Sequence, residues 1–409
     1  MHLIISLLAS LSVLAFGAKG DGTALDTKAI QATVDAAYAQ GGGVVELPAG
    51  TYLSGTIYLR DNIELHLCEG ATIKGSPSIE DYCAADCYPQ NWASGKDGDN
   101  TSGGHLIVGV GLRNVAITGP GAIDGNSEAF LLDSNGVLWP SKKAIPVRPS
   151  QMVWFADCSG IRIEGVEMSN SPYWTCFILN CDWVWIRDCY VHTERRKFHT
   201  YNGDGFDIDR SQHVLISGCR IDTADDCITL RASCGKLLER PQDCAYVYVT
   251  GCGISSSCNA IRVGVGEGAI HDAYFSDIDI SDSGTAFNYV AAYGKTSRGT
   301  DIHDIRTYDV RVEAKCFLKM HHMYSREAEF SDILFEGVSG STEQKAIIRA
   351  WHEHPFRNIV MKDVELPLGY EAVNAEIAVD GGSFPEMQLS EEKRRQIEED
   401  MAAFKHLLH

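Results

Sequence analysis

Residues 201–228 hold the most conspicuous cluster of reactive groups in this chain, because they contain six aspartates. Asp225 and Asp226 are adjacent, and adjacent carboxylates disfavour each other's ionisation unless a cation, a metal or a catalytic task accommodates them. Asp204 is separated from them by one strand-like run, Val214–Ser217. If the chain makes one coil across this run, the three carboxylates return to one patch. Such a patch has the groups that acid–base cleavage of a glycosidic bond requires.

The same residues are also typical of ordinary turns. Asp204 stands between Gly203 and Gly205, which permit backbone conformations that most residues resist. Asp-Gly pairs commonly form turns, and a double aspartate before a strand is often a solvated corner. The spacing alone therefore leaves the catalytic and the structural interpretation equally open.

Two motifs around these aspartates resemble a known signature. NGDGFDI begins at Asn202, and DDCITL begins at Asp225. Together they resemble the N-T-D-G-x-D-I and D-D-C blocks of the polygalacturonase family, glycoside hydrolase family 28. Gly203 is the departure in the first block, where the family usually has Thr. The resemblance extends over roughly residues 16–370 and includes the phrase NSPYWTCFILNC at 170–181.

The resemblance implies an inverting hydrolase of pectin-type polysaccharides or oligosaccharides, galacturonan or rhamnogalacturonan. In this mechanism one carboxylic acid protonates the departing oxygen while opposing carboxylates activate a water. Carried onto this chain, Asp225 is the general acid, and Asp204 with Asp226 holds and deprotonates the water. Clustered like charges raise the pKa of one member and keep it protonated. Asp207 and Asp222 are expected to lie away from this patch.

The chain departs from the family pattern at two further blocks. The G-H-G block reads Ser257-Cys258-Asn259, without histidine, and the R-I-K block falls near 287–290, without either cation. These losses favour a rhamnogalacturonan-cleaving or exo-acting branch. Arg262 is the candidate that replaces a lost cation; the alternative is an arginine on the outer face of a coil.

Other candidate substrate-binding residues are more weakly supported. Asn202 belongs to the first motif. Trp174 is either a stacking surface for a sugar ring or a core tryptophan. Lys319, followed by His321 and His322, is a further candidate for the cleft. No cofactor and no metal is implied, because the carboxylates have no neighbouring His or Cys set with ligand spacing.

Short strand phrases recur along most of the chain and predict the fold. Self-similarity at 20–35 residues, without intervening helices, is typical of a stacked repeat whose coils share one core. The prediction is an all-β fold, a single right-handed parallel β-helix; a β-propeller is the alternative. The phrases lie at 115–119, 161–165, 184–189, 214–219, 247–252 and 333–338.

Helices are predicted at both ends of the β-helix. Asp26 is expected to cap a helix over Thr27–Ala39, which glycines 41–43 end. A second amphipathic helix is expected over Leu389–Leu408, with an apolar stripe that covers the open edge of the β-helix. The predicted boundaries are a signal peptide at 1–18, a β-helix domain at 16–385 and the C-terminal helix at 386–409.

The apolar run Leu3–Phe16 bears on the cellular compartment in which the protein is expected. It is short for a membrane span and fits a signal-peptide core, or it is itself a buried first strand. The first interpretation predicts a secreted or periplasmic protein. The net charge of −20 argues against a nucleic-acid partner. We expect a monomer that binds a polysaccharide or oligosaccharide and no membrane.

Fourteen cysteines fit either disulfides or a ladder of buried thiols. The ladder is suggested by Cys189, Cys219 and Cys252, each of which closes a similar strand phrase. Cys83 and Cys87 are the expected local disulfide pair.

Two other functions compete with hydrolysis. A polysaccharide lyase on the same scaffold would use Ca²⁺ with a Lys or Arg base and release an unsaturated product. A non-catalytic, adhesin-like β-helix would bind carbohydrate without turnover. The set of Asp204, Asp225 and Asp226 argues against the binding protein, whereas the missing histidine and cations favour it.

Overall fold

The computed structural model describes residues 10–83, 100–233, 242–293, 298–323, 327–387, 389–392, 394–395 and 399. The chain divides into two compact units, unit 1 (residues 1–203) and unit 2 (residues 204–409). Both consist mainly of short strands that pair in parallel with the equivalent strands of the neighbouring coils.

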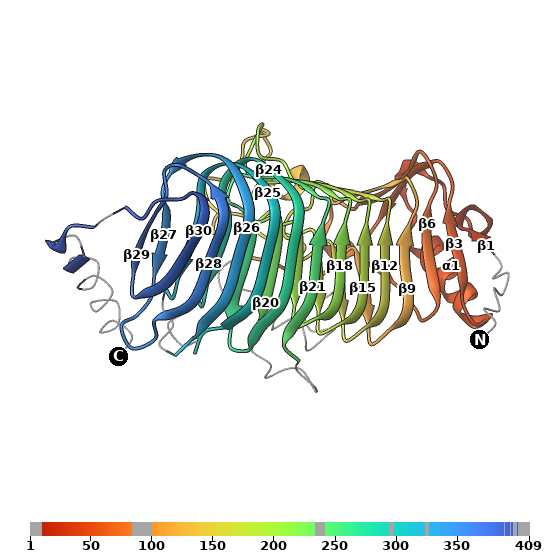
Figure 1. The fold of residues 1–409 in the computed structure, drawn as a ribbon. Coiled ribbons are helices and arrows are strands. Elements are labelled where there is room, and N and C mark those ends of the chain that lie inside the picture. The colour runs from red at the N-terminus through yellow and green to blue at the C-terminus, as the bar shows by residue number, and fades with distance from the viewer. Residues whose placement is uncertain are drawn as a thin grey trace, which may run out of the picture. The chain divides into compact units, whose positions relative to one another are not determined.

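Unit 1 illustrates the coil pattern. Strand β12 (Ser159–Glu164) pairs in parallel with β9 (Arg113–Thr118) on one side and with β15 (Asp182–Arg187) on the other (Figure 1). The other elements of unit 1 are β1 (Ser10–Ser12), η1 (Val13–Phe16), β2 (Asp21–Leu25), α1 (Thr27–Ala39), β3 (Gly43–Leu47), β4 (Gly50–Ser54), β5 (Ile57–Tyr58), β6 (Ile63–Leu67), β7 (Ala71–Gly75), η2 (Ile79–Asp81), β8 (Ile107–Val110), β10 (Ala122–Asp124), α3 (Glu128–Leu131), β11 (Val153–Ala156), β13 (Glu167–Ser169), β14 (Cys176–Leu179) and β16 (Tyr190–His192).

Unit 2 repeats this arrangement with longer strands. Strand β24 (Ala269–Val290) is long enough to pair successively with β21 (Cys244–Thr250), β22 (Gly253–Ser256) and β23 (Asn259–Gly266). Parallel pairing from coil to coil excludes the propeller, whose blades are antiparallel hairpins. The other strands of unit 2 are β17 (Phe206–Asp209), β18 (Gln212–Ser217), β19 (Arg220–Thr223), β20 (Ile228–Ala232), β25 (Asp301–His321), β26 (Phe330–Gln344), β27 (Ala346–Arg349), β28 (Phe356–Glu365), β29 (Tyr370–Val373) and β30 (Ala375–Ser383).

The core consists of aliphatic side chains stacked from coil to coil. Leu65, Ile117, Ile163 and Ile186 occupy one register row of unit 1, and none of them is exposed. Because side chains alternate across a strand, the intervening residues face outward. The predicted strand phrases are confirmed.

The N-terminal helix is confirmed with one correction. Helix α1 (Thr27–Ala39) buries Ile30 and Val34, and the chain turns away after it at Gly41, which has a left-handed φ of 95°. Asp26 occupies the N-cap position, but its carboxylate does not cap the helix. It accepts the backbone N–H groups of Lys19 and Gly20 instead, so Asp26 anchors the opening loop.

The second half of the N-terminal apolar run is part of the first coil. Strand β1 pairs in parallel with β3, and Val13 is fully buried. A signal peptide ending at residue 18 would remove this strand. The boundaries at 18 and 385 stay predictions. The apolar stripe expected on the C-terminal helix (Ile397, Met401, Phe404 and Leu408) lies outside the described residues.

Buried thiols stack between coils, as in the predicted ladder. The backbone N–H of Cys158 donates to the sulfur of Cys181 at 3.4 Å in unit 1. In unit 2 a hydrogen bond with Cys219, together with burial, raises the pKa of the Cys252 thiol. The predicted Cys83–Cys87 pair includes Cys87, which lies outside the described residues.

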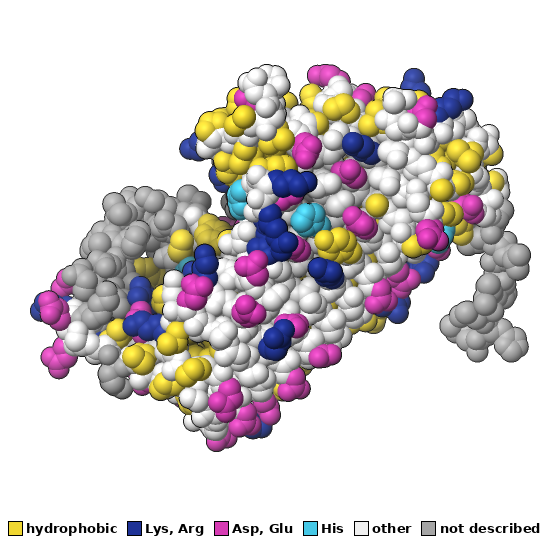
Figure 2. Space-filling view, turned by 90° about the horizontal axis from the view of Figure 1, so that it is seen from above, with side chains coloured by type: hydrophobic (Ala, Val, Ile, Leu, Met, Phe, Trp, Pro, Cys, Tyr) yellow, Lys and Arg dark blue, Asp and Glu magenta, His cyan; other side chains and the backbone are white. Residues whose placement is uncertain are grey.

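The surface carries charges of both signs. On the face shown in Figure 2, acidic side chains lie among lysines and arginines, and the described residues form no continuous basic band there. No helix in the described part of the chain is long and apolar enough to cross a membrane.

Shortening Ile163 tests the stacked core. Ile163→Ala should lower the free energy of unfolding by about 2–5 kcal/mol, whereas Ile163→Val should lower it by about 0.5–1.5 kcal/mol, because the cavity is smaller. Chemical denaturation of both variants measures the series. Equal and negligible losses would contradict close packing at this row.

Candidate active site

Parallel stacking of three strands in unit 2 brings the acidic motifs together. Asp207 on β17, Thr229 on β20 and Arg262 on β23 are register partners in successive coils. The loops before β17 and β20 are joined because the Gly205 N–H donates to the Asp226 carbonyl at 2.8 Å. A Cβ on Gly205 would lie 2.4 Å from the Cys227 carbonyl oxygen. Glycine is thus required here for close approach rather than for a special φ.

Arg262 is the centre of the acidic cluster. Its Nε forms an ion pair with Asp226 Oδ2, and its Nη2 lies 3.8 Å from Asp204 Oδ2 and 4.0 Å from Asp207 Oδ1. Arg262 is 2% exposed, so it is not an outer-face arginine. It supplies a cation within the carboxylate patch.

Asn259 and Asp225 complete the cluster. The Asn259 Nδ2 donates to Asp226 Oδ1 at 2.6 Å, so the two oxygens of Asp226 are held by an amide and a guanidinium. Asp225 is only partly buried. Its backbone carbonyl accepts hydrogen bonds from Thr223 and Ser256 at 2.7 and 2.6 Å, which fix the backbone of the double aspartate. Asp204, Asp225 and Asp226 therefore meet in one patch.

Burial and mutual repulsion shift the titration of two carboxyl groups. Burial, followed by the charges of Asp225, Asp207 and Asp226, raises the pKa of Asp204 well above its ordinary value. Burial also raises the pKa of Asp207 to about 7, although Arg231 and Arg262 oppose the shift. Within the described residues, Asp204 Oδ1 and both Asp207 oxygens have no hydrogen-bond partner. A patch of this kind retains a proton and has open acceptor sites.

The expectation that Asp207 lies away from the patch was wrong. Asp207 is fully buried beside Arg262, and Arg231 Nη1 lies 3.7 Å from Asp207 Oδ1. Arg231 also pairs with Asp209 at 3.5 Å, and Asp209 accepts the Ser233 N–H at 2.8 Å. Asp207 thus connects the cluster to a second buried ion pair.

One group of described residues has the composition of a metal site. Ligand atoms of Asp225, Asp226 and Cys258 lie within 4.8 Å of one another. Because Asp226 is already engaged by Arg262 and Asn259, we assign this group no metal.

A separate pocket of about 290 Å³ lies further along the same register row of unit 2. Arg262 pairs with Asn288, and Asn288 with Lys319, which lines the pocket. Two coil spacings place Lys319 roughly 10 Å from the Arg262 row. Burial and the cations Lys319 and Arg349 lower the pKa of His321 to about 4. The other lining residues are His322, Met323, Ile347 and Trp351.

Two further predicted residues belong to unit 1. Trp174 is 1% exposed and stacks on Tyr173 with ring centroids 5.0 Å apart, an environment that fits the core alternative. Asn202 accepts a hydrogen bond from Arg148 Nη2 at 3.1 Å. The fully buried Arg148 also donates to the carbonyl oxygens of Pro172 and Tyr201. Asn202 is therefore held in place by an arginine.

Four residues that contribute to these sites were not predicted from the sequence: Asn259, Arg231, Arg349 and Arg148. The position of Asn259 could have identified it as a site residue, because it lies in the block where histidine was expected and three residues before Arg262. The other three lie outside the recognised motifs, so no pattern singled them out.

Comparison with known proteins defines the class. The model of glycosyl hydrolases family 28 matches residues 90–379, so this chain belongs to that family. The chain is 26% identical over 283 residues to an exo-poly-alpha-D-galacturonosidase of Dickeya chrysanthemi, covering 58% of this chain and 45% of that protein. It is 30% identical over 235 residues to a probable polygalacturonase of Vitis vinifera, covering 54% and 44%. The chain thus spans less than half the length of these relatives.

Solved structures confirm the predicted right-handed parallel β-helix. An exopolygalacturonase from Thermotoga maritima matches with a TM-score of 0.71 at 19% identity, covering 91% of this chain and 92% of that one. A family 28 exopolygalacturonase from Yersinia enterocolitica also gives 0.71, at 21% identity and with coverage of 93% and 76%. At these identities the likeness establishes the fold alone.

Replacing Asp207 tests the electrostatics of the cluster. The folded pKa of about 7 exceeds the ordinary value of 3.8, so the folded state binds more protons between these values. This group therefore makes the wild type less stable as the pH rises from about 4 to about 7. Asp207→Asn removes that loss. The melting temperature of the variant relative to that of the wild type should therefore increase as the pH rises from about 4 to about 7.

Thermal melting at a series of pH values measures this difference. The exposed Asp21 provides the control, because hydrogen bonds from the backbone N–H groups of Ala24 and Thr23 lower its pKa. The melting temperature of Asp21→Asn relative to the wild type should not increase over this pH range. A gap between Asp207→Asn and wild type that does not change with pH would contradict the raised pKa.

Proposed function

We propose that this chain is an inverting glycoside hydrolase that cleaves pectin-type polysaccharides or their oligomers. The observation that carries the proposal is the buried patch of Asp204, Asp207 and Asp226, neutralised by Arg262 and bordered by the more accessible Asp225. Carboxyl groups that share a proton at a partly open edge suit general acid–base catalysis.

Each residue of the site has a separate role in the proposed hydrolysis. Asp225 donates its proton to the glycosidic oxygen as the bond from that oxygen to the anomeric carbon breaks. A water held by Asp204 and Asp226 attacks the opposite face of that carbon, and its proton passes to the Asp226 carboxylate, because the raised pKa of Asp204 keeps that group protonated. One displacement inverts the anomeric centre. Arg262 and Asn259 orient Asp226 and limit the repulsion within the pair.

The pocket at Lys319 supports an acidic sugar as substrate. Lys319 places a cation along the sheet that carries the aspartates, beside the neutral imidazole of His321 and beside Arg349, whose Nη2 pairs with Glu371. Charge-assisted hydrogen bonds from such cations recognise carboxylates. The Dickeya relative is an exo-poly-alpha-D-galacturonosidase and the Vitis relative a probable polygalacturonase, which supports the same substrate class. A polymer substrate is consistent with action outside the cytoplasm.

A lyase mechanism is less well supported by this site. A lyase needs a neutral Lys or Arg as its base. The charges of Asp226, Asp204 and Asp207 raise the pKa of Arg262 well above its ordinary value despite burial. Arg262 therefore remains a cation and cannot accept a proton.

The decisive assay is release of reducing sugar from polygalacturonate and from rhamnogalacturonan in parallel. Asp225→Asn should lower kcat by about 10²–10⁴-fold because the general acid is lost, whereas Asp222→Asn, in the same stretch, should stay near the wild-type rate. Silence of the wild type on both polymers would contradict the proposal. EDTA-sensitive activity that releases a product absorbing in the ultraviolet would indicate the lyase.

Lys319→Ala tests the acidic-sugar pocket. Losing a charge-assisted contact should raise KM for polygalacturonate roughly tenfold or more with a smaller change in kcat. Lys345 provides the control, since it pairs with Glu371 at 2.6 Å and does not line the pocket. An unchanged KM in Lys319→Ala would place substrate recognition elsewhere.

A further inference from the structure

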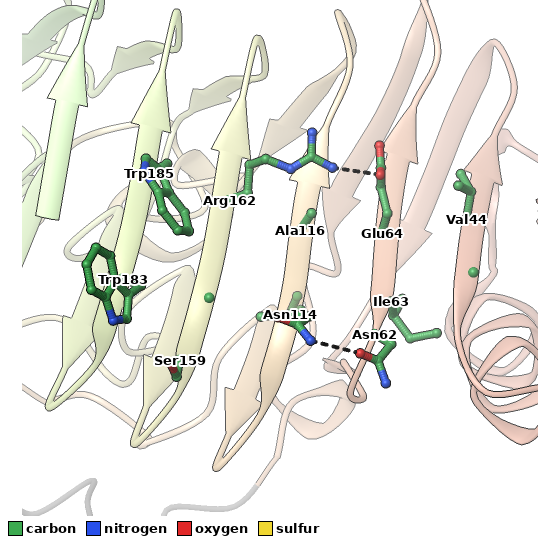
Figure 3. Close-up of a pocket in the computed structure, with 13 residues that line it drawn as sticks. Val44, Asn62, Ile63, Glu64, Asn114, Ala116, Ser159, Arg162, Trp183 and Trp185 are labelled. Carbon is green, nitrogen blue, oxygen red and sulfur yellow. Dashed lines mark hydrogen bonds and ion pairs between the residues drawn. The ribbon is translucent and has the colours of Figure 1, made fainter. Parts of the chain in front are cut away.

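Unit 1 has a hollow of about 500 Å³ on its surface, formed by the sheet that contains β3, β6, β9, β12 and β15 (Figure 3). Trp183 and Trp185 on β15 form one end of it. Its lining includes no residue of the aspartate patch or of the Lys319 pocket. The hollow is therefore a separate feature that hydrolysis does not explain.

The backbone at Trp183 is left-handed, as it is at the bulky Tyr246 of unit 2 (φ 55°). One position in each of four coils is left-handed, and three of these positions hold residues that tolerate this conformation: Asn62 (φ 60°), Asn114 (φ 53°) and Gly160 (φ 76°). The fourth is Trp183, with φ 58°. A bulky residue rarely adopts this conformation. Because 49% of Trp183 is exposed, core packing is a weak reason for an indole at this place.

The two indoles present a surface suited to a flat, partly apolar ligand. Their centroids lie 6.3 Å apart with 27° between the ring planes. The neighbouring coil carries only Gly160 and Ser159 beside Trp183, so the space next to this ring stays open. A Cβ on Gly160 would lie 3.0 Å from Asn114 Oδ1. Stacking of C–H groups of a pyranose ring on an indole face fits this geometry.

Polar groups continue along the hollow away from the aromatic end, and the charges of its two ionic residues cancel. The Asn114 amide donates to Asn62 Oδ1 at 3.1 Å. Arg162 reaches across the small Ala116 to pair with Glu64 at 2.8 Å (Figure 3). These two are the charged residues among those that line the hollow. Amides and a neutralised ion pair suit the hydroxyl groups of a neutral sugar better than a carboxylate.

We propose that this hollow is a non-catalytic binding site for a chain of neutral pyranose sugars. Trp183 and Trp185 stack on sugar rings, while Asn62, Asn114 and Arg162 hydrogen-bond hydroxyl groups. The site would hold the protein on a glycan that it does not cleave. Binding at this site does not depend on the proposed hydrolysis.

Affinity electrophoresis in gels containing soluble galactan, xyloglucan or polygalacturonate tests the site, in an Asp225→Asn background that avoids cleavage. At least one neutral glycan should retard the protein. Trp185→Ala and Trp183→Asn should each weaken this retardation at least about tenfold. Tyr38→Ala removes an aromatic that is 47% exposed on α1, outside the hollow, and should not.

The melting temperature separates binding from folding. Asn suits the left-handed backbone better than Trp, so Trp183→Asn should melt at or above the parent temperature while binding is lost. No retardation by either neutral glycan, or retardation unchanged in both tryptophan variants, would overturn the proposal. Retardation by polygalacturonate alone would also overturn it. Since no turnover is measured, failure here is distinguishable from failure of the proposed hydrolysis.

Discussion

The ion pair between Arg262 and Asp226 is the interaction on which the candidate site depends. Three carboxyl groups and one guanidinium share a nearly dry environment in unit 2. Removing one member of a buried ion pair commonly costs about 3–5 kcal/mol, because the remaining charge is left without compensation. Arg262 must therefore both stabilise the fold and compensate the negative charge of the carboxyl groups. It keeps Asp226 in place while leaving Asp204 Oδ1 and the Asp207 carboxylate without hydrogen-bond partners in the described structure.

This arrangement accounts for the missing family cations. The cation lies inside the carboxylate patch at Arg262, and Asn259 binds Asp226 in the block where the family carries histidine. Lys319 and Arg349 lie further along the sheet, where Arg349 pairs with Glu371. In the proposed function, the acidic sugar is bound by a different coil from the one that controls the aspartates. In unit 1, the tryptophan hollow adds a third surface, whose two charged residues, Arg162 and Glu64, form an ion pair.

The repeat of apolar phrases was sufficient to predict the β-helix, because a buried face at every second residue is a local property of each strand. The meeting of Asp204, Asp225 and Asp226 also followed from one coil between the motifs. The pairing of Asp207 with Arg262 did not. Successive phrases from 161 to 247 are separated by 23, 30 and 33 residues, so a fixed period cannot show which residue stacks on which. Trp174 was ambiguous because an aromatic in a strand has the same pattern in a core as beneath a sugar.

The configuration of the first product tests the central claim most directly. Proton NMR recorded during cleavage of an oligogalacturonide distinguishes the two anomers before they interconvert. A single displacement by water between Asp204 and Asp226, with Asp225 as acid, predicts that the new reducing end first appears with the anomeric configuration opposite to that of the bond cleaved. Retention of configuration would require a covalent intermediate, and an unsaturated sugar would require elimination. Either result would contradict the assigned roles of the three aspartates.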